Sequence, residues 1–136
     1  MSLDGRRRLL ALASDLDVPV LEDTAYAALR FEGNEIAPYL AKRDVMLAAL
    51  ERHMPAGVTW TGPEGGLFVW ATLPVHIDTA ALLQRAVSET QVAFVPGHAF
   101  FADGTGRNTM RLSYSLPSAD KITEGVALLA GLISRA

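Results

Sequence analysis

Arg111 is the residue of this sequence whose type and setting most directly suggest a binding function. It stands in a run where Met110, Leu112 and Tyr114 alternate with polar residues, a period of two that is typical of a β-strand with one apolar face. A guanidinium group on a rigid strand can hold a carboxylate, because its N–H donors match the two carboxylate oxygens. We therefore predict a site for small organic acids, with an ordinary ion pair to a surface acid as the alternative.

Asp23 and Tyr26 form a second candidate pair. They follow a short apolar run, residues 18–21, that reads as a buried strand. Active-site groups in α/β sheets often lie at the carboxyl ends of strands. An aspartate there can hydrogen-bond a protonated ring nitrogen, and a tyrosine hydroxyl can donate to a ring oxygen. The alternative is a turn-forming aspartate with a tyrosine packed on the surface.

The remaining titratable groups give weaker signals. The chain has no cysteine, which excludes disulfides and thiol catalysis, and its three histidines lack the spacing of a helical metal site. We predict no metal. His98 follows a Pro-Gly turn and could act as an acid or base, but it reads more simply as an exposed loop residue. The net charge of −3 argues against a nucleic-acid partner.

The sequence has the character of a globular domain of 136 residues, half of them hydrophobic. It contains neither a signal-peptide pattern nor a run long enough to span a membrane, so we expect a cytoplasmic protein without a membrane partner.

Apolar periodicity and turn residues predict the elements that would position these groups. We expect helices over residues 3–16, 36–53, 80–89 and 118–133, and strands over 18–21, 58–60, 67–73, 92–95 and around Arg111. From Gly33 onward this order predicts a two-layer α/β sandwich, in the α+β sense, with helices on one face of a mixed or antiparallel sheet. Residues 1–33 do not fit that unit, so we place a domain boundary there, between 1–33 and 34–136.

Five segments in series resemble the class I/II pyridoxal-phosphate-dependent aminotransferases of fold type I. The subgroup they resemble includes 2-aminoadipate aminotransferases and the aminotransferase-like domains of MocR-type regulators. The segments are residues 18–26, 29–33, 63–70, 92–97 and 108–115. The resemblance implies that residues 34–136 are the small C-terminal domain and that 1–33 are an αβ remnant of the large, cofactor-binding domain.

The resemblance also implies roles for three residues. Asp23 matches the aspartate that pairs with the pyridine nitrogen of pyridoxal 5'-phosphate, and Tyr26 matches the tyrosine that bonds its phenolic oxygen. Arg111 matches the arginine that holds the substrate carboxylate. The substrates implied are an amino acid and a 2-oxo acid.

One departure from the family pattern concerns the lysine that forms the Schiff base. The segment that carries it in the family should follow Tyr26, yet residues 30–33 run almost directly into the next helix. The chain has two lysines, Lys42 and Lys121, and both lie in charged helical stretches where we expect them to be solvated. We therefore predict an internally deleted fragment with no catalytic lysine, inactive alone, whose binding of pyridoxal phosphate is doubtful.

Two other interpretations remain open. The chain could be a non-catalytic module that binds a small acid or mediates oligomerisation, or a decayed fragment that folds without function. In the family the small domain packs on other parts of the enzyme, so this chain should expose apolar surface that is buried there. Exposed apolar surface favours self-association, and we therefore expect a homodimer or a higher oligomer.

Overall fold

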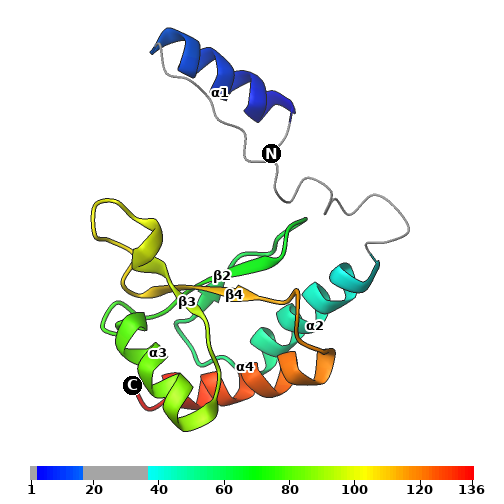
Figure 1. Ribbon diagram of the computed structural model, residues 1–136, viewed down its shortest axis with the longest axis vertical. Helices are drawn as coiled ribbons and strands as arrows, with labels where there is room; N and C mark the ends of the chain where they lie inside the picture. Colours follow the sequence, from blue (N-terminus) through cyan, green and yellow to red (C-terminus); the bar gives the residue numbers. More distant parts are fainter. Residues whose placement is uncertain (1–2, 17–36) are drawn as a thin grey trace.

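The computed structural model describes residues 3–16 and 37–136 (Figure 1). The first part is helix α1 (Leu3–Asp15). The second contains helices α2 (Ala37–His53), α3 (Thr79–Thr90) and α4 (Ala119–Ile133), with a short 3-10 helix η1 (Gly97–Phe100). Its strands are β1 (Thr59–Trp60), β2 (Phe68–Thr72), β3 (Val95–Pro96) and β4 (Thr109–Ser113).

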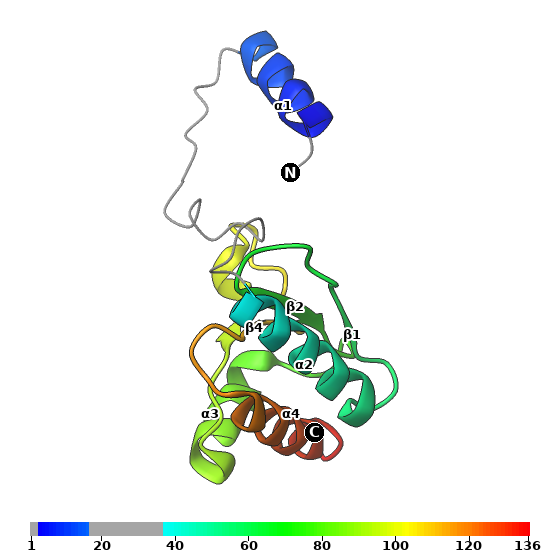
Figure 2. The same cartoon turned by 90° about the vertical axis from the view of Figure 1, so that its right-hand side faces the viewer.

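The four strands form one antiparallel sheet in the order β1-β2-β4-β3. Helices α2, α3 and α4 lie together on one side of it, and Figure 2 shows α2 and α4 side by side in that layer. The predicted two-layer sandwich with an antiparallel sheet is therefore confirmed. The predicted strand over residues 18–21 and the predicted domain boundary near Gly33 both lie outside the described residues.

The core fills the space between the sheet and the helices. Alternate residues of the two central strands, Val69 and Ala71 on β2 and Met110 and Leu112 on β4, are buried, and apart from the buried Thr109 their neighbours on these strands are half-buried or exposed. This is the period-two pattern of a sheet with one covered face. The helical side contributes residues such as Leu50, Leu129 and Leu132. The opposite face of the sheet is the face that bears Arg111.

Local sequence signals set the ends of two helices. The Asp78 carboxylate accepts hydrogen bonds from the main-chain nitrogens of Ala80 and Ala81 and caps α3. These two bonds, aided by the charges of Arg107 and His98, lower the pKa of Asp78. Ser118 caps α4 by accepting from the nitrogen of Lys121.

The expected strand over residues 92–95 is wrong in extent. Strand β3 pairs with β4 only through Val95 and Pro96. A proline is acceptable there because β3 is an edge strand, where a missing N–H need not be paired. Before Val95 the chain leaves β4, and Phe94 is buried in the core.

No helix in either described part is both long and apolar enough to cross a membrane.

Candidate functional site

Arg111 is the third residue of β4, half-buried, on the face of the sheet opposite the helices. Its register partners are Trp70 on β2 and Val95 on β3. Its own neighbours, Met110 and Leu112, point into the core and fix the strand in place. The guanidinium therefore stands on a rigid central strand, as the sequence predicts.

Two aromatic rings flank the guanidinium. The Arg111 Cζ atom lies 4.1 Å from the centre of the Phe68 ring and 4.8 Å from that of Phe100. Phe68 belongs to β2, and Phe100 is the last residue of the 3-10 helix that follows β3. The two rings therefore come from different elements, one on the neighbouring strand β2 and one on η1. Both distances are within the range of a cation–π interaction.

Two further rings complete what we call the aromatic cluster: Phe68, Trp70, Phe100 and Phe101. The Trp70 and Phe100 rings meet edge to face with centroids 5.4 Å apart, and Trp70 and Phe101 lie 6.1 Å apart. Phe100 and Phe101 remain 47% and 40% exposed. Phe68 and Trp70 lie two residues apart on β2, within a predicted strand, whereas the sequence gives no local signal that Phe100 and Phe101 join them.

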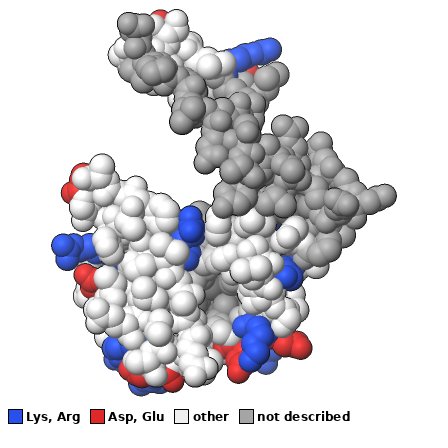
Figure 3. Space-filling view, viewed as in Figure 1, with Lys and Arg blue, Asp and Glu red and all other residues white. Residues whose placement is uncertain are grey.

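The charged edge of Arg111 has no protein partner among residues 3–16 and 37–136. Its guanidinium forms no ion pair and no hydrogen bond with any side chain or main-chain group there. The interpretation of Arg111 as half of an ordinary surface ion pair therefore finds no support in the described parts. Figure 3 shows charged side chains of both signs along the lower rim, over the helical layer, with others at the left edge and basic ones higher on this face.

Close packing holds η1, and with it Phe100, against the start of β4. Gly97 is buried, and a Cβ atom there would collide with the Thr109 hydroxyl and crowd the Thr109 and Gly106 carbonyls. The Thr109 hydroxyl donates to the Gly106 carbonyl at 2.8 Å. The buried Thr79 hydroxyl lies 2.8 Å from the Thr109 carbonyl and so joins α3 to the same point.

The other residues singled out in the sequence lie away from this cluster or outside the described residues. His98 is exposed on η1, in agreement with its interpretation as a loop residue. Asp23 and Tyr26 lie outside the described residues. No group of three or more metal-ligating side chains occurs within the described ranges.

The prediction that both lysines are solvated is wrong for Lys42. Its Nζ atom is 2.8 Å from the Ser115 carbonyl, a partly buried hydrogen bond that ties α2 to the connection between β4 and α4. Lys121 is exposed, as predicted, and pairs with Glu124 at 2.7 Å. The charged neighbours of Lys42 in the helix predict a solvated side chain, whereas its hydrogen-bond partner lies 73 residues away in the sequence.

Neither lysine therefore fits the role of a Schiff-base nucleophile. Such a lysine needs a free amine in an environment that lowers its pKa. Lys42 is committed to main-chain carbonyls, and the carboxylate of Glu124 raises the pKa of Lys121. That the chain lacks a Schiff-base lysine stays a prediction, and these contacts of Lys42 and Lys121 are what the structure adds to it.

The chain bends at the glycine pair before β2. Gly66 has a φ of +86°, a conformation that favours glycine, and its carbonyl accepts a 2.8 Å hydrogen bond from the buried Tyr114 hydroxyl. Burial raises the pKa of Tyr114, against the opposing effect of the Arg43 charge. This contact fastens the strand that carries Arg111 to the strand that carries Phe68.

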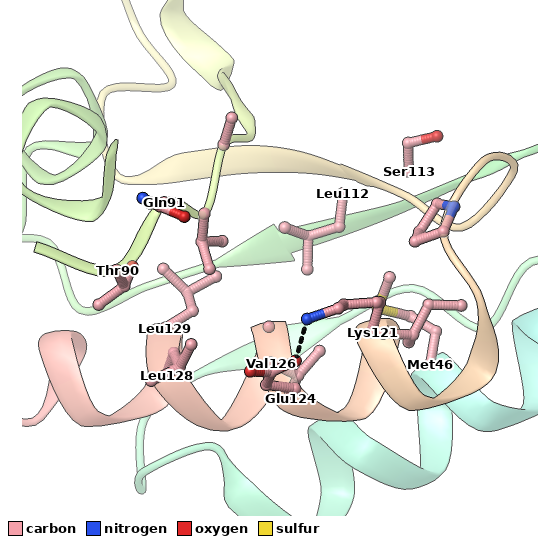
Figure 4. Close-up of a pocket in the computed structure, with 15 residues that line it drawn as sticks. Met46, Thr90, Gln91, Leu112, Ser113, Lys121, Glu124, Val126, Leu128 and Leu129 are labelled. Carbon is pink, nitrogen blue, oxygen red and sulfur yellow. Dashed lines mark hydrogen bonds and ion pairs between the residues drawn. The ribbon is translucent and has the colours of Figure 1, made fainter. Parts of the chain in front are cut away.

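A pocket of about 340 Å³ opens on the other side of the sheet. It lies between β4, the segment that joins α3 to β3, and α4. Figure 4 shows the Lys121–Glu124 ion pair beside the apolar residues that line it. Leu112, Val126 and Leu129 line it, and Arg111 does not. The pocket and the aromatic cluster are therefore separate features.

Comparison with known proteins identifies relatives of this chain, although no family model matches it. It is 55% identical over 95 residues to aromatic-amino-acid aminotransferase 1 of Thermococcus litoralis, a match that covers 70% of this chain and 22% of that protein. It is 42% identical over 122 residues to 2-aminoadipate transaminase of Thermus thermophilus, covering 85% of this chain and 30% of that protein.

A solved structure agrees with these relatives. The alpha-aminoadipate aminotransferase of Thermus thermophilus, complexed with N-(5'-phosphopyridoxyl)-L-leucine, superposes with a TM-score of 0.70 at 44% identity, over 74% of this chain and 25% of that one. The chain thus spans less than a third of the length of each of these proteins. Its homologues and structural neighbours are fold type I aminotransferases, which use pyridoxal phosphate and act on amino acids and 2-oxo acids, and the chain is a partial-length relative of that family.

Proposed function

We propose that this chain is the carboxylate-binding part of an aminotransferase-type protein, with Arg111 as the group that binds the acid. The observation that carries the proposal is the guanidinium of Arg111 on a central strand. It contacts two aromatic rings and has no hydrogen-bond or ion-pair partner within the described residues. A carboxylate fits the N–H edge of the guanidinium, because two parallel N–H···O bonds combine charge and geometry.

We further propose that the chain alone does not transaminate. Family chemistry requires a lysine that reacts with the cofactor aldehyde, and the contacts of Lys42 and Lys121 leave neither available. The roles of Asp23 and Tyr26 toward pyridoxal phosphate remain predictions from the family resemblance, as does the assignment of residues 1–33 and 34–136 to two domains.

The proposed ligands are small carboxylic acids of the kind that aminotransferases process, namely amino acids and 2-oxo acids. The names of the relatives point to aromatic amino acids and 2-aminoadipate as ligand types to test first. The alternative drawn from the sequence is a non-catalytic module that binds a small acid or mediates oligomerisation. In its acid-binding form it would use the same carboxylate-binding Arg111, but it would not belong to any protein that transfers amino groups.

Exposed apolar side chains support self-association of the chain. Leu9, Leu10, Leu12 and Leu16 in and after α1 are all exposed, and Val75 and Leu116 are at least 90% exposed. Large apolar patches favour association because their burial removes them from water. We propose a dimer or higher oligomer, and light scattering of the purified chain tests it: a monomeric mass over a range of concentrations contradicts the proposal.

Calorimetric titration with 3-phenylpropionate tests carboxylate binding at Arg111. This acid is stable and has no amino or oxo group, so it cannot take part in amino transfer. We expect Arg111→Ala to weaken binding by roughly tenfold or more, since a hydrogen bond to a charged group is lost. Arg107→Ala is the matched control, because Arg107 is 76% exposed and pairs with Asp78. Equal affinities for the wild type and Arg111→Ala, or no binding by the wild type, contradict the proposal.

Reduction with borohydride after incubation with pyridoxal phosphate tests the proposal that the chain alone does not transaminate. We expect no single lysine peptide to carry the cofactor stoichiometrically. A stoichiometric adduct on Lys42 or Lys121 contradicts the inactivity of the chain.

A further inference from the structure

We propose that Phe68 and Phe100 are positioning residues for Arg111: their rings hold the guanidinium in one orientation, with its N–H edge presented to the ligand. The inference rests on the carboxylate-binding function proposed above. It goes beyond that function because it assigns the orientation of the Arg111 guanidinium to two residues that do not themselves bind the carboxylate.

The geometry of the aromatic cluster leads to this assignment. Cζ of Arg111 lies 4.1 Å from the Phe68 centroid and 4.8 Å from the Phe100 centroid. An aromatic ring attracts a cation through its electron-rich face and offers no oxygen or nitrogen acceptor, so neither ring satisfies the guanidinium N–H donors as a carboxylate would. The donors thus stay available for an acid, although the side chain is in contact with a ring from β2 and a ring from η1.

Phe100 is itself held in place by the surrounding structure. Trp70 packs edge to face against it at 5.4 Å, and Trp70 is the register partner of Arg111 on β2. The 3-10 helix η1, which carries Phe100, can approach β4 only because Gly97 has no side chain that would collide with Thr109. The ring position therefore follows from the packing of β2, η1 and β4 together.

Holding the guanidinium matters because arginine is a long side chain with many rotamers. A free side chain loses this freedom when a ligand binds, and that loss opposes binding. A side chain already fixed by rings loses less. Removing one ring should consequently weaken the binding of every carboxylate, whatever group the acid carries beyond its carboxylate.

The test compares two acids and three variants of the full chain. Propionate and 3-phenylpropionate share a carboxylate and differ by a phenyl group, and their dissociation constants are measured by NMR titration, which reaches millimolar affinities. We expect Phe100→Leu to weaken both acids by a similar factor, roughly threefold to tenfold, the range of one cation–π interaction. Phe100→Tyr, which retains a ring, should restore binding.

Phe101→Leu is the matched control. Phe101 is adjacent in sequence, similarly exposed and also packed near Trp70, but it has no ring contact with Arg111. We expect it to leave both dissociation constants unchanged. The side-chain resonances of Arg111 give an independent readout without ligand: Phe100→Leu should remove a ring-current shift that Phe101→Leu preserves.

The outcomes separate this inference from the function on which it rests. A wild type that binds neither acid overturns both. Binding that depends on Arg111 but is unchanged in Phe100→Leu overturns the positioning role alone. Weakening confined to 3-phenylpropionate also overturns it, because Phe100 would then contact the phenyl group of the ligand instead of orienting the Arg111 guanidinium.

Discussion

The guanidinium carbon of Arg111 lies 4.8 Å from the centre of the Phe100 ring, although the two residues stand on different elements. Phe100 ends η1, and Arg111 is in the middle of β4, with a loop of eight residues between these elements. The contact depends on how closely η1 packs on the start of β4. Its stability should accordingly respond to changes at the point where those two elements touch.

Gly97→Ala should destabilise the protein by about 1–3 kcal/mol, because the added methyl group overpacks a buried contact with Thr109. It should also displace η1 and reduce the ring-current shift at Arg111. Urea denaturation measures the first effect and NMR the second.

Gly62→Ala is the control for that substitution, since no atom lies within 4 Å of the added Cβ. We expect its unfolding free energy to stay within about 0.5 kcal/mol of the wild type. Equal midpoints for the Gly97 and Gly62 variants would show that the close approach of η1 to β4 is unimportant.

Lys42→Met should lower the free energy of unfolding by about 1 kcal/mol, because a charged donor to the Ser115 carbonyl is lost. Lys121→Met should leave the urea midpoint unchanged, because its ion pair with Glu124 is exposed and screened by solvent. The comparison tests whether Lys42 has a structural role. It fails if the two substitutions have the same effect.

Tyr114→Phe should cost about 1 kcal/mol near neutral pH, because the Gly66 carbonyl loses its buried donor. The folded state raises the pKa of Tyr114 above its ordinary value of 10.0. The folded protein therefore keeps this proton to higher pH than the unfolded chain does, and stability should fall as pH rises above about 10.

The pH dependence of Tyr114→Phe gives the corresponding measurement. Its unfolding free energy should decline less steeply between about pH 10 and 11.5 than that of the wild type. Parallel profiles for the two proteins would mean that the tyrosine titrates alike in the folded and unfolded states.

The sequence predicts the regular elements well where the signal is local. Asp78 and Ser118 cap α3 and α4 as their residue types suggest, and the alternation around Arg111 correctly predicts a strand with one buried face. Such signals lie within one turn of helix or one strand, so no knowledge of the tertiary structure is needed.

Features that depend on contacts between distant segments could not be predicted in this way. Strand β3 is shorter than its apolar run, because Phe94 enters the core instead of the sheet. Phe100 contacts Arg111 only because β3 lies next to β4 in the sheet and because Gly97, which has no side chain, lets η1 pack against β4. Lys42 resembles a solvated helical lysine until the connection at Ser115 is placed beside it.

The most direct test of the account is the response of the Arg111 Nε–H resonance to propionate and to propionamide in the full chain. The two molecules have almost the same shape, but only the first carries a charged carboxylate. A saturable shift with propionate and none with propionamide, seen for Arg111 and not for Arg107, is the predicted result. Equal responses to both molecules, or no response to propionate, would contradict a carboxylate clamp at Arg111.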